Sequence, residues 1–174
     1  HGEGTFVVTD REDQEIAQTF AQHLVNLQLT PLELLETRLV VECPVARCCA
    51  ERASDDDIKQ IESFLEHNRM ERGEAVGLEK MNNDFHLAIA RATGNRGLYS
   101  LVEGVYSMMS INLWPKLKDV VADKKDRSVL HLKQHVQIFE AIKARDPELT
   151  ENLVRNHLKT IEHEFIEDAT QYNG

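Results

Sequence analysis

The chain has 174 residues, of which 41% are hydrophobic and 29% charged, and its formal net charge is −10. This length and balance are typical of one globular domain with a real core, and no apolar run reaches the roughly 20 residues of a transmembrane helix. The negative charge argues against nucleic-acid binding by this chain alone, because such binding depends on neutralising phosphates.

Helices are predicted along almost the whole chain. The exception is the start, where residues 2–9 form a glycine turn that runs into a β-branched stretch, which predicts a short strand. Helical periodicity, caps and breakers then predict seven helices. The first two are expected at about residues 10–26 and 30–53, a third begins at residue 54, and a fourth ends at about residue 94. The last three are expected at about residues 96–114, 127–145 and 147–170. Pro44 lies inside the second helix and should kink or break it, and residues 123–126 are expected to form a solvated loop. We therefore predict an all-α fold, an antiparallel bundle of six or seven helices.

Three cysteines lie in the second expected helix: Cys43, Cys48 and Cys49. Their odd number and close grouping fit neither a disulfide framework nor the spacing of a zinc ribbon. No signal-peptide pattern opens the chain. We interpret the cysteines as reduced, buried, small apolar residues of a cytoplasmic protein.

Three histidines carry the strongest functional signal. His86, His135 and His157 each lie on the apolar stripe of a different expected helix, so all three imidazoles should point inward. A buried histidine needs a hydrogen-bond partner, and three that converge can share a metal ion. One inward histidine is more often a core residue whose hydrogen bonds are made within the protein. Three on separate helices make a metal site as good an interpretation as three such core residues.

Arg38 also lies on an apolar stripe, among leucines and valines of the second expected helix. A buried guanidinium keeps its charge and requires an anion. One candidate is Glu42, one turn later. The other is the carboxylate of a ligand, which the planar guanidinium can bind through two parallel hydrogen bonds. Together with the three histidines, we favour a ligand carboxylate that bridges a metal and Arg38.

Other histidines are expected outside the site. His131 stands one turn before His135 but nearer the polar side, which predicts a solvated residue or one that supports a ligand from behind. His163 should lie on the outer surface. The sequence contains no Glu-x-x-His pair of a di-iron bundle and no Gly-x-Ser-x-Gly motif of a serine hydrolase.

A set of short motifs points to one family. They are Gly2-Glu3-Gly4-Thr5-Phe6-Val7, Leu34-Leu35-Glu36-Thr37-Arg38, Asp84-Phe85-His86-Leu87-Ala88-Ile89-Ala90, Gly94-Asn95, Gln134-His135 and Asn156-His157-Leu158. With them, nearly the whole chain resembles the FCD domain, the effector-binding domain of transcriptional regulators in the FadR branch of the GntR superfamily. The Leu-Leu-Glu-Thr-Arg motif is most similar to regulators of pyruvate, lactate or glycolate metabolism.

The resemblance implies a helical bundle that binds a divalent metal, zinc or nickel most often, and a small organic acid. His86, His135 and His157 match the three metal-binding histidines of the family. The family's fourth ligand is an aspartate, and this chain has Asn82 at that position. A neutral amide oxygen should hold a metal less tightly than a carboxylate. The acid would bind Arg38 through its carboxylate.

The resemblance also implies how the chain is organised. Residues 1–9 would be the end of the wing of a winged helix-turn-helix domain, and residues 10–174 the effector-binding domain. We expect the sensor half of a longer, homodimeric regulator that binds operator DNA through an N-terminal domain, and not an enzyme. Two alternatives stay open, namely a three-histidine metal hydrolase or hydratase and a metal-free helical bundle that binds an acid.

Overall fold

A computed structural model of the chain describes residues 29–70, 75–112 and 125–172. These residues form six α-helices: α2 (Pro31–Arg52), α3 (Asp55–Met70), α4 (Ala75–Arg91), α5 (Arg96–Asn112), α7 (Lys125–Lys143) and α8 (Pro147–Tyr172). No strand occurs among the described residues, which confirms the all-α prediction. The expected wing at residues 1–9 and the expected helix at 10–26 lie outside the described residues.

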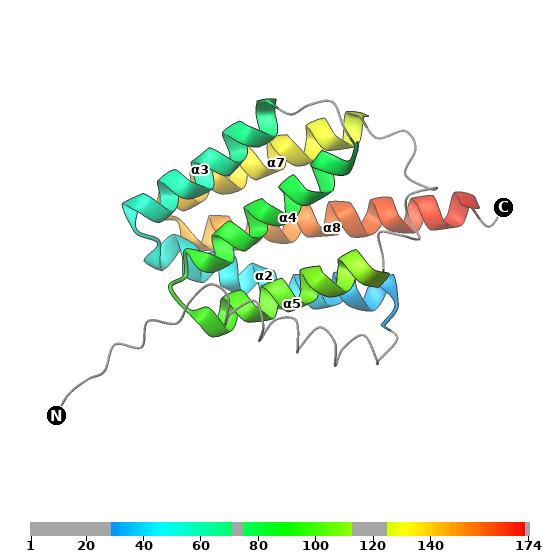
Figure 1. Cartoon of the computed structure of the whole chain (residues 1–174), viewed down its shortest axis with the longest axis horizontal. Coiled ribbons are helices and arrows are strands. Elements are labelled where there is room, and N and C mark those ends of the chain that lie inside the picture. The colour runs from blue at the N-terminus through cyan, green and yellow to red at the C-terminus, as the bar shows by residue number, and fades with distance from the viewer. Residues whose placement is uncertain (1–28, 71–74, 113–124, 173–174) are drawn as a thin grey trace.

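The six helices form a closed ring. Around the ring, α2 packs against α8, α8 against α7, α7 against α3, α3 against α4, α4 against α5, and α5 against α2. Successive helices run in alternating directions (Figure 1). α2 also contacts α4 and α7 across the ring, so side chains that point inward from several helices meet beside α2. None of the described helices has an apolar stretch long enough to span a membrane.

The start of α2 follows from its sequence. The Thr30 side chain accepts a hydrogen bond from the backbone N–H of Glu33, and the Glu33 carboxylate accepts one from the backbone N–H of Thr30. This reciprocal capping box satisfies two backbone donors that the helix itself cannot pair, and Pro31 occupies the first turn without losing a needed hydrogen bond. The predicted cap followed by a proline is confirmed.

Pro44 does not break α2, which continues from Pro31 to Arg52. Of the two outcomes expected at Pro44, a kink or a break, the break does not occur, and the reason is local. Pro44 is exposed, and the carbonyl that loses its hydrogen-bond partner belongs to Val40, whose side chain is 70% exposed. Water can therefore replace the missing backbone donor on the outer face of the helix.

The remaining helix ends differ from the predictions by a few residues. α7 begins at Lys125, inside the segment that we expected to be a solvated loop. Of the four residues of that segment, Lys125 and Asp126 belong to the first turn of α7, and residues 123–124 lie outside the described part of the chain. Between α4 and α5 the chain turns at Gly94, which has a φ of +66° that favours glycine. This tight turn brings α5 back along α4.

The largest cluster of core residues joins α2, α3, α4, α7 and α8 and includes Phe85, Ile138 and Ile142. Cys43 and Cys49 are buried in it, as expected, whereas Cys48 is only half-buried. All three cysteines are free thiols. The apolar stripes read from the sequence therefore face the centre of the ring.

Candidate functional site

Three buried imidazoles meet near the centre of the ring. His86 comes from α4, His135 from α7 and His157 from α8, and each side chain is at most 3% exposed. The Nε2 atom of His157 lies 3.1 Å from Nε2 of His135 and 3.3 Å from Nε2 of His86. The structure thus brings together the three histidines that the sequence singled out, and their ligand atoms form one group.

Neighbouring side chains fix which nitrogen of two of these rings carries the proton. Nδ1 of His86 lies 2.8 Å from the Glu42 carboxylate, and Nδ1 of His157 lies 2.8 Å from the amide oxygen of Gln134. The Gln134 amide nitrogen donates to the Thr160 hydroxyl, which orients the amide. Because both Nδ1 atoms face acceptors, they carry the protons, and the Nε2 lone pairs face one another.

Burial keeps the three imidazoles neutral. It lowers the pKa of His86, although the Glu42 carboxylate opposes this shift, and it lowers the pKa of His135 and His157 well below the ordinary value. The ring of Phe85 stacks on His135 at a centroid distance of 4.3 Å and holds that imidazole in place. Neutral imidazoles with converging lone pairs are the form that a metal ion requires.

The spacing of these nitrogens suits a transition metal. A tetrahedral zinc ion with Zn–N distances of about 2.0–2.1 Å would separate two ligand nitrogens by roughly 3.3 Å. The Nε2–Nε2 distances of 3.1 Å from His157 to His135 and 3.3 Å from His157 to His86 match this value. The donor set therefore fits a divalent metal held by three imidazoles, with further coordination positions left for oxygen ligands.

Stability of the metal-free protein should fall as the pH decreases. The three folded-state pKa values lie below the unfolded value near 6.5, so below this pH the unfolded chain gains protons that the folded chain does not. The contribution of these neutral histidines to the free energy of unfolding is fully present above that pH. It is lost as the pH falls, by about 1.4 kcal/mol per pH unit for each histidine. Urea unfolding of the chelator-treated protein between about pH 7 and pH 5 measures this slope, and a flat profile would contradict burial of neutral imidazoles.

Arg38 lies beside the histidines and has a partner within the chain. Its Nε donates to Glu42 over 2.6 Å, and its Nη2 donates to the hydroxyl of Tyr106. That hydroxyl in turn donates to the second carboxylate oxygen of Glu42 over 3.2 Å. Of the two anions considered from the sequence, Glu42 is therefore the one that pairs with Arg38 in this structure.

The ion pair is deeply buried, with Arg38 1% exposed and Glu42 4% exposed. Burial alone would raise the pKa of Glu42, but Arg38 and His86 lower it to about 2. Glu42 is thus a carboxylate at neutral pH. Burial would lower the pKa of Arg38, but Glu42 and Tyr106 raise it above its ordinary value, so both charges are permanent.

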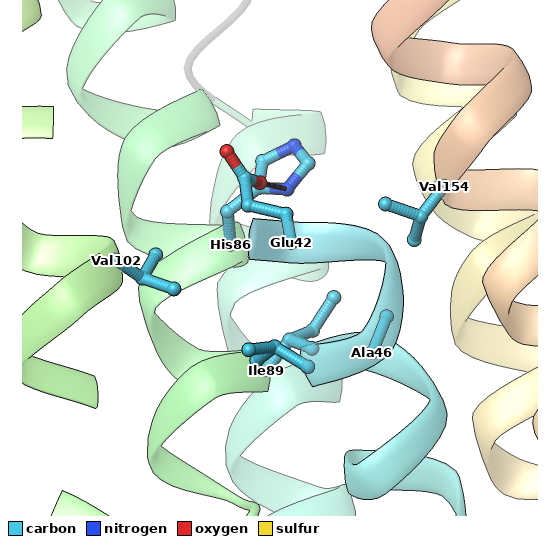
Figure 2. A pocket seen from close by; sticks show the side chains of 7 residues that line it. Glu42, Ala46, His86, Ile89, Val102 and Val154 are labelled. Carbon is cyan, nitrogen blue, oxygen red and sulfur yellow. Dashed lines mark ion pairs between the residues drawn. The ribbon is translucent and has the colours of Figure 1, made fainter. Parts of the chain in front are cut away.

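A small cavity lies beside Glu42 and His86 (Figure 2). Its other walls are aliphatic side chains from α2, α4, α5 and α8, namely Val45, Ala46, Ile89, Val102 and Val154. It has room for about one water molecule.

His131 and His163 lie where the sequence suggested. His131 is 24% exposed and contacts the Glu164 carboxylate over 3.0 Å, and its ring makes a T-shaped contact with His157 at a centroid distance of 5.5 Å. His163 is on the surface and pairs with Glu167. Asn82 lies in α4, but its side chain is outside the described part of the structure, as are the side chains of His23 and His67.

Sequence reasoning missed two supporting residues and one contact. Gln134 and Tyr106 were not singled out as site residues, although an inward tyrosine hydroxyl on an apolar stripe needs a polar partner and could have signalled one. Glu42 was one of the two anions considered for Arg38, although a ligand carboxylate was favoured, and its contact with His86 was not foreseen. That contact depends on how α2 and α4 are rotated against each other, which periodicity within one helix does not report.

Residues 33–160 match the family model described as FCD domain. Over 92% of its length, the chain is 29% identical to HTH-type transcriptional regulator LutR of Bacillus subtilis and covers 73% of that relative. Over 91% of its length, it is 27% identical to the Exu regulon transcriptional regulator of Escherichia coli and covers 59% of it. The chain thus spans roughly three fifths to three quarters of the length of these two relatives.

Two solved structures share the fold. Escherichia coli McbR/YncC aligns with a TM-score of 0.66 and 17% identity, over 82% of this chain and 71% of that one. Streptococcus agalactiae GntR aligns with a TM-score of 0.58 and 19% identity, over 90% of this chain and 62% of that one. At such low identity these likenesses establish the helical architecture and nothing finer.

Proposed function

The chain belongs to the FCD domain family of GntR-type transcriptional regulators, and from this premise we propose that it senses a small organic acid through a divalent metal. His86, His135 and His157 would hold the metal. The observation that carries the proposal is the group of three buried nitrogens, two of them with lone pairs that Glu42 and Gln134 turn toward one another. Without a shared partner such lone pairs repel each other, and a metal ion supplies that partner.

The proposed ligand is a hydroxy or keto acid of two to six carbons. A bound metal would offer a Lewis-acidic position to one of its oxygens, and Arg38 would bind its carboxylate. The Leu34-Leu35-Glu36-Thr37-Arg38 motif, which is similar to regulators of pyruvate, lactate or glycolate metabolism, supports acids of this size. The metal is zinc or nickel, both of which accept imidazole ligands.

In a longer protein, acid binding would alter the affinity for operator DNA. The relatives that the chain matches are regulators, and LutR is of the helix-turn-helix type by its name. We propose that the intact protein is a homodimer whose DNA-binding domains change their relative arrangement when the acid binds. Operator binding by the longer protein, with and without the acid, tests this step.

A hydrolase or hydratase with the same three histidines is the alternative. Such an enzyme usually needs a general base beside its metal-bound water. Among the described contacts of the three histidines, Glu42 is the carboxylate in place, but Arg38, Tyr106 and His86 occupy its oxygens. With a pKa of about 2 it is a poor base near neutral pH, so the contacts around Glu42 support a sensor instead.

The proposal is tested by native mass spectrometry of protein isolated from cells, followed by calorimetry. We expect about one zinc or nickel ion per chain, and binding of an acid from a panel that includes glycolate, lactate and pyruvate. Absence of both metal and acid binding would contradict the proposal. Turnover of simple esters or carbon dioxide by the metal-loaded protein would favour the hydrolase or hydratase.

Replacing Asn82 by aspartate is expected to tighten metal binding. Asn82 precedes His86 by one helical turn, and a carboxylate at this position adds a charged oxygen ligand. Titration of each metal-loaded protein with a competing chelator measures the difference. If the same chelator concentration removes the metal from wild type and from Asn82→Asp, residue 82 is not a ligand.

A further inference from the structure

Glu42 contacts both Arg38 and the group of three histidines. One carboxylate oxygen, Oε1, lies 2.6 Å from Nε of Arg38. The other, Oε2, lies 2.8 Å from Nδ1 of His86 and accepts a hydrogen bond from Tyr106. The whole side chain is buried in the centre of the helical ring (Figure 2). One carboxylate therefore contacts the arginine proposed to bind the acid and a histidine proposed to bind the metal.

On the arginine side, Glu42 occupies the position that an acid would need. Arg38 is 1% exposed, and its described partners are Glu42 and Tyr106. The small cavity on the other side of Glu42, beside His86, accommodates about one water molecule. A second carboxylate added to Arg38 would also lie close to Glu42, where the repulsion between two buried anions is severe. An acid must therefore compete with Glu42 for the guanidinium.

On the histidine side, Glu42 has the opposite effect. Its carboxylate accepts the Nδ1 proton of His86 and so directs Nε2 toward Nε2 of His157, 3.3 Å away. A carboxylate behind a ligand histidine fixes the ring and raises its basicity toward a metal. Gln134 gives His157 a neutral acceptor in the same place. The negative charge that supports a metal on His86 is thus the one that opposes an acid on Arg38.

We propose that Glu42 is a built-in competitor of the acid at Arg38 and, at the same time, the positioning residue that prepares His86 for the metal. The inference rests on the proposed function and deepens it. An incoming acid takes over Arg38 from Glu42, and the released carboxylate remains on His86. Glu42 therefore sets the acid concentration to which the site responds.

The variant Glu42→Gln separates the two roles. Glutamine keeps the size and an acceptor oxygen but removes the charge, so Arg38 loses its internal anion. Binding of glycolate, lactate or pyruvate to the metal-free variant should tighten by about tenfold or more, as a charged hydrogen bond becomes available. Binding of Zn²⁺ alone should weaken by roughly 10- to 100-fold. General damage to the fold would weaken both, so opposite shifts identify the proposed mechanism.

Glu164→Gln is the matched control. Glu164 also holds a histidine through its carboxylate, but that histidine is His131, outside the group of three. Its replacement should leave the Zn²⁺ and acid affinities unchanged. A second variant, Arg38→Met combined with Glu42→Gln, removes both buried charges in case Glu42→Gln alone does not fold. It should show the same weakening of Zn²⁺ binding and no gain in acid binding.

Calorimetry with each acid and competition titration with Zn²⁺ give distinguishable outcomes. If wild type binds neither, the proposed function fails. If wild type binds Zn²⁺ or an acid and Glu42→Gln loses affinity for both, or changes neither, the inference about Glu42 is overturned while the proposed function stands. Zn²⁺ affinity in the double variant equal to that of wild type would overturn the positioning role. Tighter acid binding together with weaker Zn²⁺ binding in Glu42→Gln supports the inference.

Discussion

The variant His157→Ala is expected to lose its metal and the stability that the metal provides. His157 is fully buried, and its Nε2 lies within 3.3 Å of Nε2 of both other histidines, so its removal takes a ligand from the middle of the group. A metal at 100 times its dissociation constant stabilises a fold by about 2.7 kcal/mol, which corresponds to roughly 5–10 °C in melting temperature for a domain of this size.

Metal content by mass spectrometry and melting curves with and without a chelator measure this loss. The chelator should lower the melting temperature of wild type but not that of His157→Ala, and His86→Ala and His135→Ala should behave in the same way. His131→Ala is the control, because His131 lies one turn from His135 on α7 but pairs with Glu164. Full metal occupancy in all three single variants of the group would contradict the assignment.

The fold could be predicted from the sequence because the spacing of apolar residues identifies the buried face of each helix. The spacing of apolar residues identified each described helix, and the Thr30-Pro31 pair identified the start of α2. The break considered at Pro44 does not occur, because a proline on an exposed face costs a helix less than one on a buried face. Whether residue 44 lies on the exposed or the buried face depends on how α2 is oriented in the bundle. The exact starts of helices such as α7 depend on local hydrogen bonds that composition reports only weakly.

The candidate site could be predicted only one helix at a time. Periodicity showed that His86, His135 and His157 face inward, but their meeting point depends on the ring in which α4, α7 and α8 take part. The same limit explains Glu42. Its pairing with Arg38 follows from a spacing of four residues on α2, whereas its contact with His86 joins two helices. Contacts within a helix are encoded by spacing, and contacts between helices by packing of the whole ring.

Arg38→Met is expected to weaken acid binding while the metal stays. Methionine keeps much of the apolar stem, but the charged donor that would bind the carboxylate is gone. The loss of a charged hydrogen bond should cost about 1.5–3 kcal/mol, or roughly 10- to 100-fold in affinity. Arg38 is not among the residues whose ligand atoms converge, so the metal content should match that of wild type. Calorimetry with acids of two to six carbons measures the change.

The buried ion pair makes stability a necessary second measurement on this variant. Without Arg38, the Glu42 carboxylate keeps His86 and Tyr106 but loses its counter-charge, and such a broken pair destabilises a fold by about 3–5 kcal/mol. Arg38→Met combined with Glu42→Gln removes both charges and should recover most of that stability without recovering acid binding. Affinity for the acid would then follow the guanidinium and not the stability of the fold. If wild type and Arg38→Met bind the acid equally well, Arg38 serves only as the ion-pair partner of Glu42.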